Sequence, residues 1–206
     1  MGDFDLPLAD RYFDNYLPGI GGILGRVTAT EKEIVTFATA LNPHTMHTDP
    51  EAARLGDFGG VIASGWHTTA IIMRLLVDHF PNERASVASP GVEELRWQQP
   101  VRPRDTLGGR FVVLSARPSA SRPDRGLARI GIELLDQHDT AVISHDHARP
   151  PPAPPAAFRS ELILIAPPAG GSLAVDPGTP RGPLIARDHI VSPPGDETPA
   201  GATEPP

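Results

Sequence analysis

The 206-residue chain contains no cysteine, which excludes disulfide bonds, thiolate metal ligands and a cysteine nucleophile. It also lacks an excess of positive charge, because 18 basic and 25 acidic residues leave a net charge of −7. Nucleic acid is therefore not an expected partner. No apolar run reaches the ~18 residues of a membrane-spanning helix, and residues 1–15 do not resemble a secretion signal. We expect a cytoplasmic protein without a membrane span.

Proline and glycine, by contrast, are abundant, and the prolines are unevenly distributed. Residues 150–206 hold 15 of the 25 prolines and have no aromatic residue after Phe158. Such a composition does not sustain a packed core. We predict one folded domain over residues 1–149 and a disordered Pro/Gly-rich tail over residues 150–206. Two short apolar runs in the tail, at 162–166 and 183–186, are the parts that could dock on the domain.

Helical signals dominate residues 30–80. Thr30 and Glu33 have the spacing of a capping box, and the Asn42-Pro43 pair ends the helix that this box opens. A short helix is predicted over residues 50–55, with Pro50 in its first turn. The longest apolar helical pattern covers residues 64–80, and we expect other elements to wrap this helix.

Alternating apolar residues replace the helical pattern after Pro81. They occur around residues 92–97 and over residues 107–116, 127–135 and 140–147, separated by turn-forming residues. This alternation is typical of antiparallel strands, and residues 22–30 have a strand-like pattern too. The predicted fold class is α+β, with an antiparallel sheet wrapped around a central helix.

Two segments carry candidate chemistry. Residues 42–50 place an amide and two imidazoles, Asn42, His44 and His47, in a turn before a helix. Residues 58–67 place Gly65 at the start of the long apolar helix. Free backbone N–H groups there can stabilise a developing oxyanion, and a glycine lets a substrate carbonyl approach without a Cβ in the way.

These segments, followed by the Pro100–Leu107 hairpin, resemble the MaoC-like dehydratases, the (R)-specific enoyl-CoA hydratase group of the hot-dog fold. The resemblance covers roughly residues 13–148. It implies a homodimer that adds or removes water at a 2-enoyl thioester of coenzyme A or acyl carrier protein, without a cofactor or metal. It places the family's catalytic histidine on His47 and its oxyanion-hole glycine on Gly65. The family's aspartate falls on Asn42, where this chain departs from the pattern.

The departure at Asn42 concerns the mechanism, because an amide cannot act as a general base. His47 could then serve as the single acid and base while Asn42 orients the water, and His44 or Asp49 could compensate for the missing carboxylate. We predict His47, Asn42 and Gly65 as catalytic residues. Ser64, Trp66 and His44 are the predicted substrate contacts.

Two other functions stay open at this point. One is a noncatalytic acyl-thioester-binding subunit that lost its base at Asn42. The other is a hot-dog thioesterase, which is disfavoured because the first carboxylate on the central helix, Asp78, lies near the helix end. His145 and His147 share one strand face without an evident third ligand, so no metal site is predicted.

Overall fold

The computed structural model of the protein describes residues 2–3, 6–143 and 158–166. Its elements follow in chain order: β1 (Gly2–Asp3), η1 (Leu8–Asp10), η2 (Phe13–Asn15), β2 (Ile20–Thr28), α1 (Glu31–Leu41), α2 (Thr45–Thr48), α3 (Pro50–Leu55), α4 (Gly65–His79), β3 (Ser86–Glu94), β4 (Thr106–Pro118), β5 (Arg125–Leu135), β6 (Ala141–Ile143) and β7 (Phe158–Ile165). No helix in these residues is long and apolar enough to cross a bilayer.

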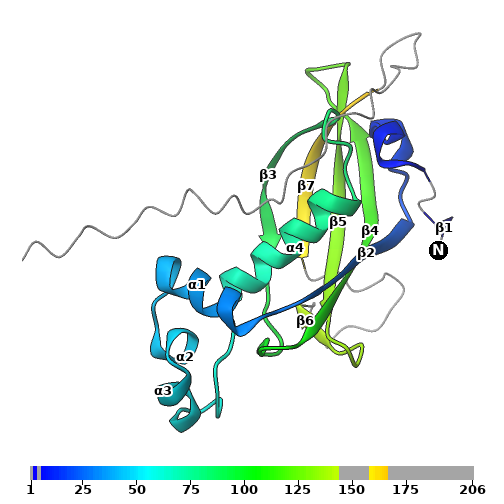
Figure 1. The fold of residues 1–206 in the computed structure, drawn as a ribbon. Coiled ribbons are helices and arrows are strands. Elements are labelled where there is room, and N and C mark those ends of the chain that lie inside the picture. Colours follow the sequence, from blue (N-terminus) through cyan, green and yellow to red (C-terminus); the bar gives the residue numbers. More distant parts are fainter. Residues whose placement is uncertain (1, 4–5, 144–157, 167–206) are drawn as a thin grey trace, which may run out of the picture. The chain divides into compact units, whose positions relative to one another are not determined.

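The described strands form one curved sheet with α4 across one of its faces (Figure 1). The strand order is β1-β2-β4-β5-β7-β3, and β6 pairs with β5 beside this path. Every pairing is antiparallel except the short parallel pair of β1 and β2. The predicted α+β architecture is confirmed.

The core lies between α4 and the sheet. From α4, the side chains of Thr68, Ile72, Leu75 and Leu76 are buried, at helical spacing. On the sheet side, Gly109 of β4 allows the close approach, because a Cβ at this position would lie only 2.9 Å from the Cβ of Leu24 on β2 and 3.4 Å from Cδ1 of Leu75. A side chain here would therefore push the helix and the strands apart.

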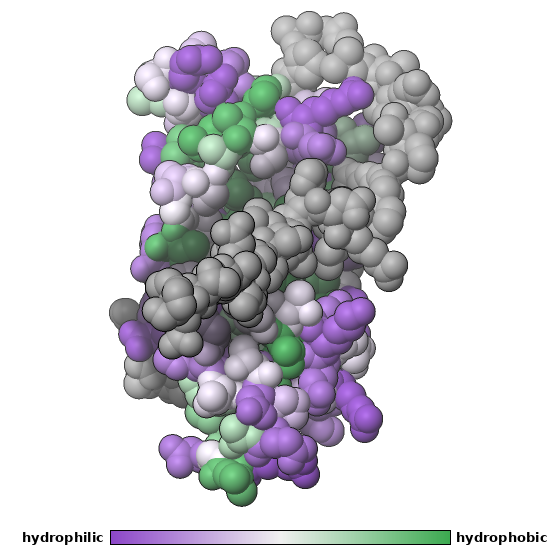
Figure 2. All heavy atoms as spheres, turned by 60° about the vertical axis from the view of Figure 1, so that its left-hand side comes forward, coloured by the Kyte–Doolittle hydropathy of each residue, from purple (hydrophilic) through white to green (hydrophobic). Residues whose placement is uncertain are grey.

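No other described element covers the opposite face of α4. Trp66, Met73 and Val77, which lie at helical spacing on this face, are 61%, 46% and 45% exposed. Within the described residues the helix is therefore not wrapped on all sides as expected, since a sheet can cover only one side of a helix that lies across it. Figure 2 shows apolar residues reaching the surface in several separate patches on the side where α1 and the start of α4 lie.

Local sequence signals set the ends of the shorter helices. The capping box of α1 is confirmed: the Glu33 amide donates to Thr30 Oγ1 at 3.2 Å, and the Thr30 amide donates to Glu33 Oε2 at 3.1 Å. The helix ends at Leu41, before Asn42-Pro43, as predicted. The short helix α3 is capped by Asp49, whose Oδ1 accepts the amides of Glu51 and Ala52.

The predicted domain boundary at residue 149 is wrong for residues 158–165. These residues form β7, which lies between β5 and β3 in the sheet, and Leu164 is completely buried in the core. The proline count of the whole tail hid a short segment of strand-forming residues, which gains its ladder hydrogen bonds only from strands distant in sequence. The run at 183–186 and the pair His145 and His147 lie outside the described residues.

Leu164→Ala should lower the free energy of unfolding by about 2–5 kcal/mol, because it removes a fully buried side chain from the core. The neighbouring Ile163, on the other face of β7, is only partly buried and offers a matched control. Ile163→Ala should cost less. Urea denaturation of both variants measures the difference. If both variants kept the wild-type urea midpoint, β7 would contribute nothing to the free energy of unfolding.

Candidate active site

Residues 61–64, which precede α4, join the predicted site together. All four are buried. The amide of Ile62 donates to the carbonyl of Met46 at 3.2 Å, and the amide of Ala63 donates to the carbonyl of Val101 at 2.8 Å. This extended segment is therefore held between α2 on one side and the start of the 101–105 turn on the other.

His47 is the best-positioned acid and base of the predicted residues. It lies in α2 and is only 4% exposed, and its Nδ1 lies 2.8 Å from the carbonyl oxygen of Ile62. A carbonyl only accepts hydrogen bonds, so Nδ1 carries the proton. In the neutral ring, Nε2 then keeps a free lone pair, and no side chain in the described part of the chain occupies it. An imidazole held in this tautomer can take a proton from a water molecule.

Asn42 lies at the C-terminal end of α1 and contacts the same 61–64 segment, at Ser64. Its Nδ2 donates to Ser64 Oγ at 3.0 Å, and Ser64 is fully buried at the N-cap of α4. The amide oxygen of Asn42 is left to accept a hydrogen bond. The structure thus brings Asn42, His47 and the start of α4 to residues 62–65, as the sequence motif predicts.

The two side chains considered as substitutes for the missing carboxylate are used elsewhere or point to solvent. Asp49 is the cap of α3, which occupies its Oδ1. His44 is exposed, and its contribution to the fold is its carbonyl, which accepts the amide of His47 at 2.8 Å. Neither geometry supplies a second base next to His47.

Gly65 begins α4, where the amides of the first turn have no acceptor within the helix and the helix dipole favours negative charge. A Cβ at position 65 would lie 2.5 Å from Cε2 of Trp97, so the missing Cβ lets the indole ring pack against the start of the helix. The sequence reasoning missed Trp97, because no pattern links it to Gly65.

Trp66, one of the predicted substrate contacts, is 61% exposed. Its ring meets the ring of Trp97 edge to face, with centroids 5.6 Å apart. The two tryptophans, which are the only ones in the chain, therefore form one aromatic pair at the start of α4.

His67, in the first turn of α4, faces α1 and packs against it. Its ring stacks on Phe37 with centroids 4.8 Å apart. Its Nδ1 is buried and has no hydrogen-bond partner in the described chain. Burial lowers the pKa of His67 below its ordinary 6.5, and the charge of Glu33 opposes this effect. The neutral ring is the form that fits the stack.

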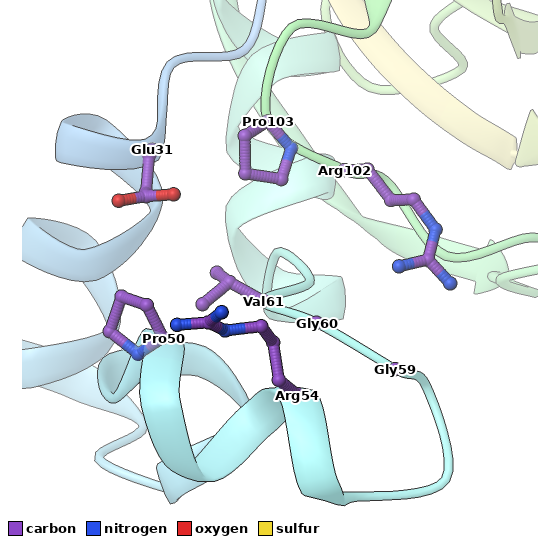
Figure 3. Close-up of a pocket in the computed structure, with 8 residues that line it drawn as sticks. All are labelled: Glu31, Pro50, Arg54, Gly59, Gly60, Val61, Arg102 and Pro103. Atoms are coloured by element: carbon purple, nitrogen blue, oxygen red, sulfur yellow. The ribbon is translucent and has the colours of Figure 1, made fainter.

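A cavity of about 450 Å³ lies next to residues 59–61, just before the buried segment 61–64 ends at α4 (Figure 3). It is lined by Glu31, Pro50, Arg54, Gly59, Gly60, Val61, Arg102 and Pro103. Arg54 pairs with Glu51, and Arg102 donates to the carbonyl of Phe58 at 2.7 Å. None of the predicted site residues lines this cavity. Its charged residues come from α1, α3 and the 101–105 turn, so sequence spacing gave no signal for it.

No cluster of three or more histidine, aspartate or glutamate side chains suited to a metal ion occurs in the described residues. The observed groups are those of proton transfer and oxyanion binding: an imidazole, an amide, and helix-head N–H groups. Together with the sheet and the central helix, they define a class of protein, the α+β hot-dog domain, with the candidate site at the head of its helix.

The chain belongs to the MaoC-like domain family, whose model matches residues 24–126. The structure of a MaoC-like dehydratase from Rhodospirillum rubrum is similar to this chain, with 33% identity and a TM-score of 0.64. The similarity covers 77% of this chain and 99% of that one. A protein of Mycobacterium tuberculosis described as having a double hot-dog fold has 20% identity and a TM-score of 0.62, over 97% of this chain and 54% of that one. The predicted hot-dog fold is confirmed.

Curated relatives match over shorter stretches. Protein MaoC of Klebsiella aerogenes is 35% identical over 98 residues, which are 47% of this chain and 29% of that protein. The 3-hydroxyacyl-thioester dehydratase Z of Mycobacterium tuberculosis is 36% identical over 77 residues, 36% of this chain and 51% of that protein. The chain therefore spans at most about half the length of these two relatives.

The lowered pKa of His67 predicts a pH-dependent stability. The unfolded chain binds a proton at His67 more readily than the folded one, so the contribution of the buried neutral ring is fully present above about pH 6.5 and is lost as the pH falls through the lower folded pKa. His67→Leu should flatten the corresponding decline in the urea midpoint between about pH 8 and about pH 5. Equal pH slopes for the wild type and this variant would contradict the prediction.

Proposed function

We propose that the protein is a hydro-lyase that adds water to, or removes it from, a 2-enoyl (3-hydroxyacyl) thioester of coenzyme A or acyl carrier protein. The observation that carries the proposal is the position of His47. The side chain is buried, and its Nδ1 bonds to the carbonyl of Ile62, which lies three residues before Gly65 and the helix-head amides. Membership of the MaoC-like family and the names of the dehydratase relatives support the same reaction class.

In the hydration direction, Nε2 of His47 takes a proton from water while the water oxygen bonds to C3 of the enoyl group. The amides of the first turn of α4 stabilise the negative charge that moves onto the thioester oxygen. The His47 imidazolium then returns the proton to C2, which restores the neutral ring and leaves a 3-hydroxyacyl thioester. Dehydration is the reverse.

Asn42 orients the water in this proposal and does not exchange a proton. Its Nδ2 is engaged by Ser64, which leaves its Oδ1 to accept an O–H of the water. A single imidazole therefore performs both proton transfers. Substrate contacts are proposed at Ser64 and Trp66, which flank Gly65 at the head of α4.

A noncatalytic acyl-thioester-binding subunit is the second candidate, and the specific observation that favours it is the amide at position 42. A thioesterase has less support: Asp78, the first carboxylate of α4, lies almost four turns from Gly65 and pairs with Arg74 at 2.7 Å.

His47→Ala should lower the rate of crotonyl-CoA hydration by about 10²–10⁴-fold, because it removes the only proposed acid and base. Asn42→Asp should raise the rate, since a carboxylate would accept the Ser64 hydroxyl and share the water proton. The loss of the enoyl-thioester absorbance measures both, and the exposed His44→Ala is the matched control that should retain activity.

Three other outcomes would contradict the assignment. Turnover that survives His47→Ala would exclude this histidine as the base. Binding of crotonyl-CoA without any turnover in the wild type would favour the binding subunit. Release of free thiol would indicate a thioesterase.

We also propose that the functional unit is a homodimer in which a second copy covers the open face of α4. Trp66, Met73 and Val77 form an exposed apolar stripe there, and among the described strands β3 lies at the sheet edge with one side of its ladder unpaired. A like chain can cover both.

Met73→Glu should shift the protein from dimer to monomer in sedimentation velocity, because it places a charge in the middle of the stripe. Leu55, on α3, is 92% exposed and gives the control: Leu55→Glu should leave the dimer intact. A wild-type monomer at micromolar concentration would refute the dimer.

A further inference from the structure

Trp97 is held in place by its backbone and is not part of a loose loop. It forms a bridge with Ile143 of β6, and the next residue, Gln98, donates its amide to the Val142 carbonyl at 2.8 Å. The segment after β3 is therefore tied to the sheet on one side while the indole ring reaches α4 on the other.

The ring is locked onto the first turn of α4 by contact and by hydrogen bonds. Three of its atoms would lie within 3.0 Å of a Cβ at Gly65, so only glycine permits this packing. Its Nε1 donates to Thr69 Oγ1 at 3.2 Å, and Thr69 Oγ1 donates to the Gly65 carbonyl at 2.9 Å. Indole, hydroxyl and helix head thus form a continuous chain of donors and acceptors.

Despite this anchoring, Trp97 remains 45% exposed. A large, rigid aromatic surface that stays open next to unsatisfied helix-head amides is suited to contact a ligand that is both apolar and carbonyl-bearing. A 2-enoyl thioester has this chemistry, because its conjugated acyl group is planar and its carbonyl oxygen accepts hydrogen bonds.

We infer that Trp97 is a specificity-determining residue whose indole forms the wall beside the Gly65 amide and restricts the site to short acyl chains. The inference rests on the proposed function, because it assumes that the thioester carbonyl lies at the head of α4. The ring packs against Gly65, so an acyl group at this helix head meets the indole, and a long chain would have to displace it.

The two tryptophans of the chain allow a direct binding test that needs no turnover. Trp66→Phe leaves Trp97 as the only tryptophan, and Trp97→Phe leaves Trp66. Titration of the first variant with crotonyl-CoA should change its fluorescence saturably, whereas free coenzyme A should change it far less. The second variant, whose Trp66 is itself a proposed contact, should give a smaller change with crotonyl-CoA than the first. A response from the Trp66 reporter alone, or no response from Trp97 while calorimetry detects crotonyl-CoA binding, would overturn the inference.

Kinetics provide the second test. Trp97→Ala should raise the kcat/KM for 2-decenoyl-CoA relative to that for crotonyl-CoA by about tenfold or more, whereas Trp97→Phe should change this ratio less. An unchanged ratio in Trp97→Ala, with wild-type thermal stability, would overturn the inference. If the wild type turns over neither thioester, the proposed hydratase function fails, and the fluorescence titration still decides the role of Trp97.

Discussion

The packing of α4 against the concave face of the sheet is the interaction on which the rest of the structure depends. Thr68, Ile72, Leu75 and Leu76 fix the helix along one stripe, and Gly109 lets β4 approach it. Since the helix cannot rotate or slide without opening this core, its first turn is fixed in space. The position of the helix-head amides is thus a consequence of hydrophobic packing several residues away.

Residues 62–65, at the start of this fixed helix, are contacted by the candidate site residues. The Ile62 carbonyl accepts a hydrogen bond from His47, and the Ser64 hydroxyl accepts one from Asn42. The indole ring of Trp97 packs against Gly65. Backbone bonds to Met46 and Val101 hold the segment itself. Groups from four separate parts of the chain therefore converge on four residues, and their relative positions are fixed by these contacts.

The charge distribution of this site distinguishes it from one built on a carboxylate and an imidazole. Asn42 stands where the family pattern has an aspartate, and Asp49 is used as a helix cap. His67, in the first turn of α4, is buried against Phe37, and burial lowers its pKa. Burial therefore favours the neutral form of the His67 ring in the folded protein.

The sequence by itself determined the features that depend on neighbouring residues: the capping box at Thr30 and Glu33, the helix stop at Asn42-Pro43, the span of α4, the alternation of β4 and β5, and the motif positions of His47 and Gly65. Local propensity and period carry this information within a few residues. Only the tertiary structure decided that residues 158–165 enter the sheet, that Trp97 fills the space over Gly65, and that Glu31, Arg54 and Arg102 line one cavity. These features join segments that are distant in the chain, and their stability comes from pairing and packing that no local pattern encodes.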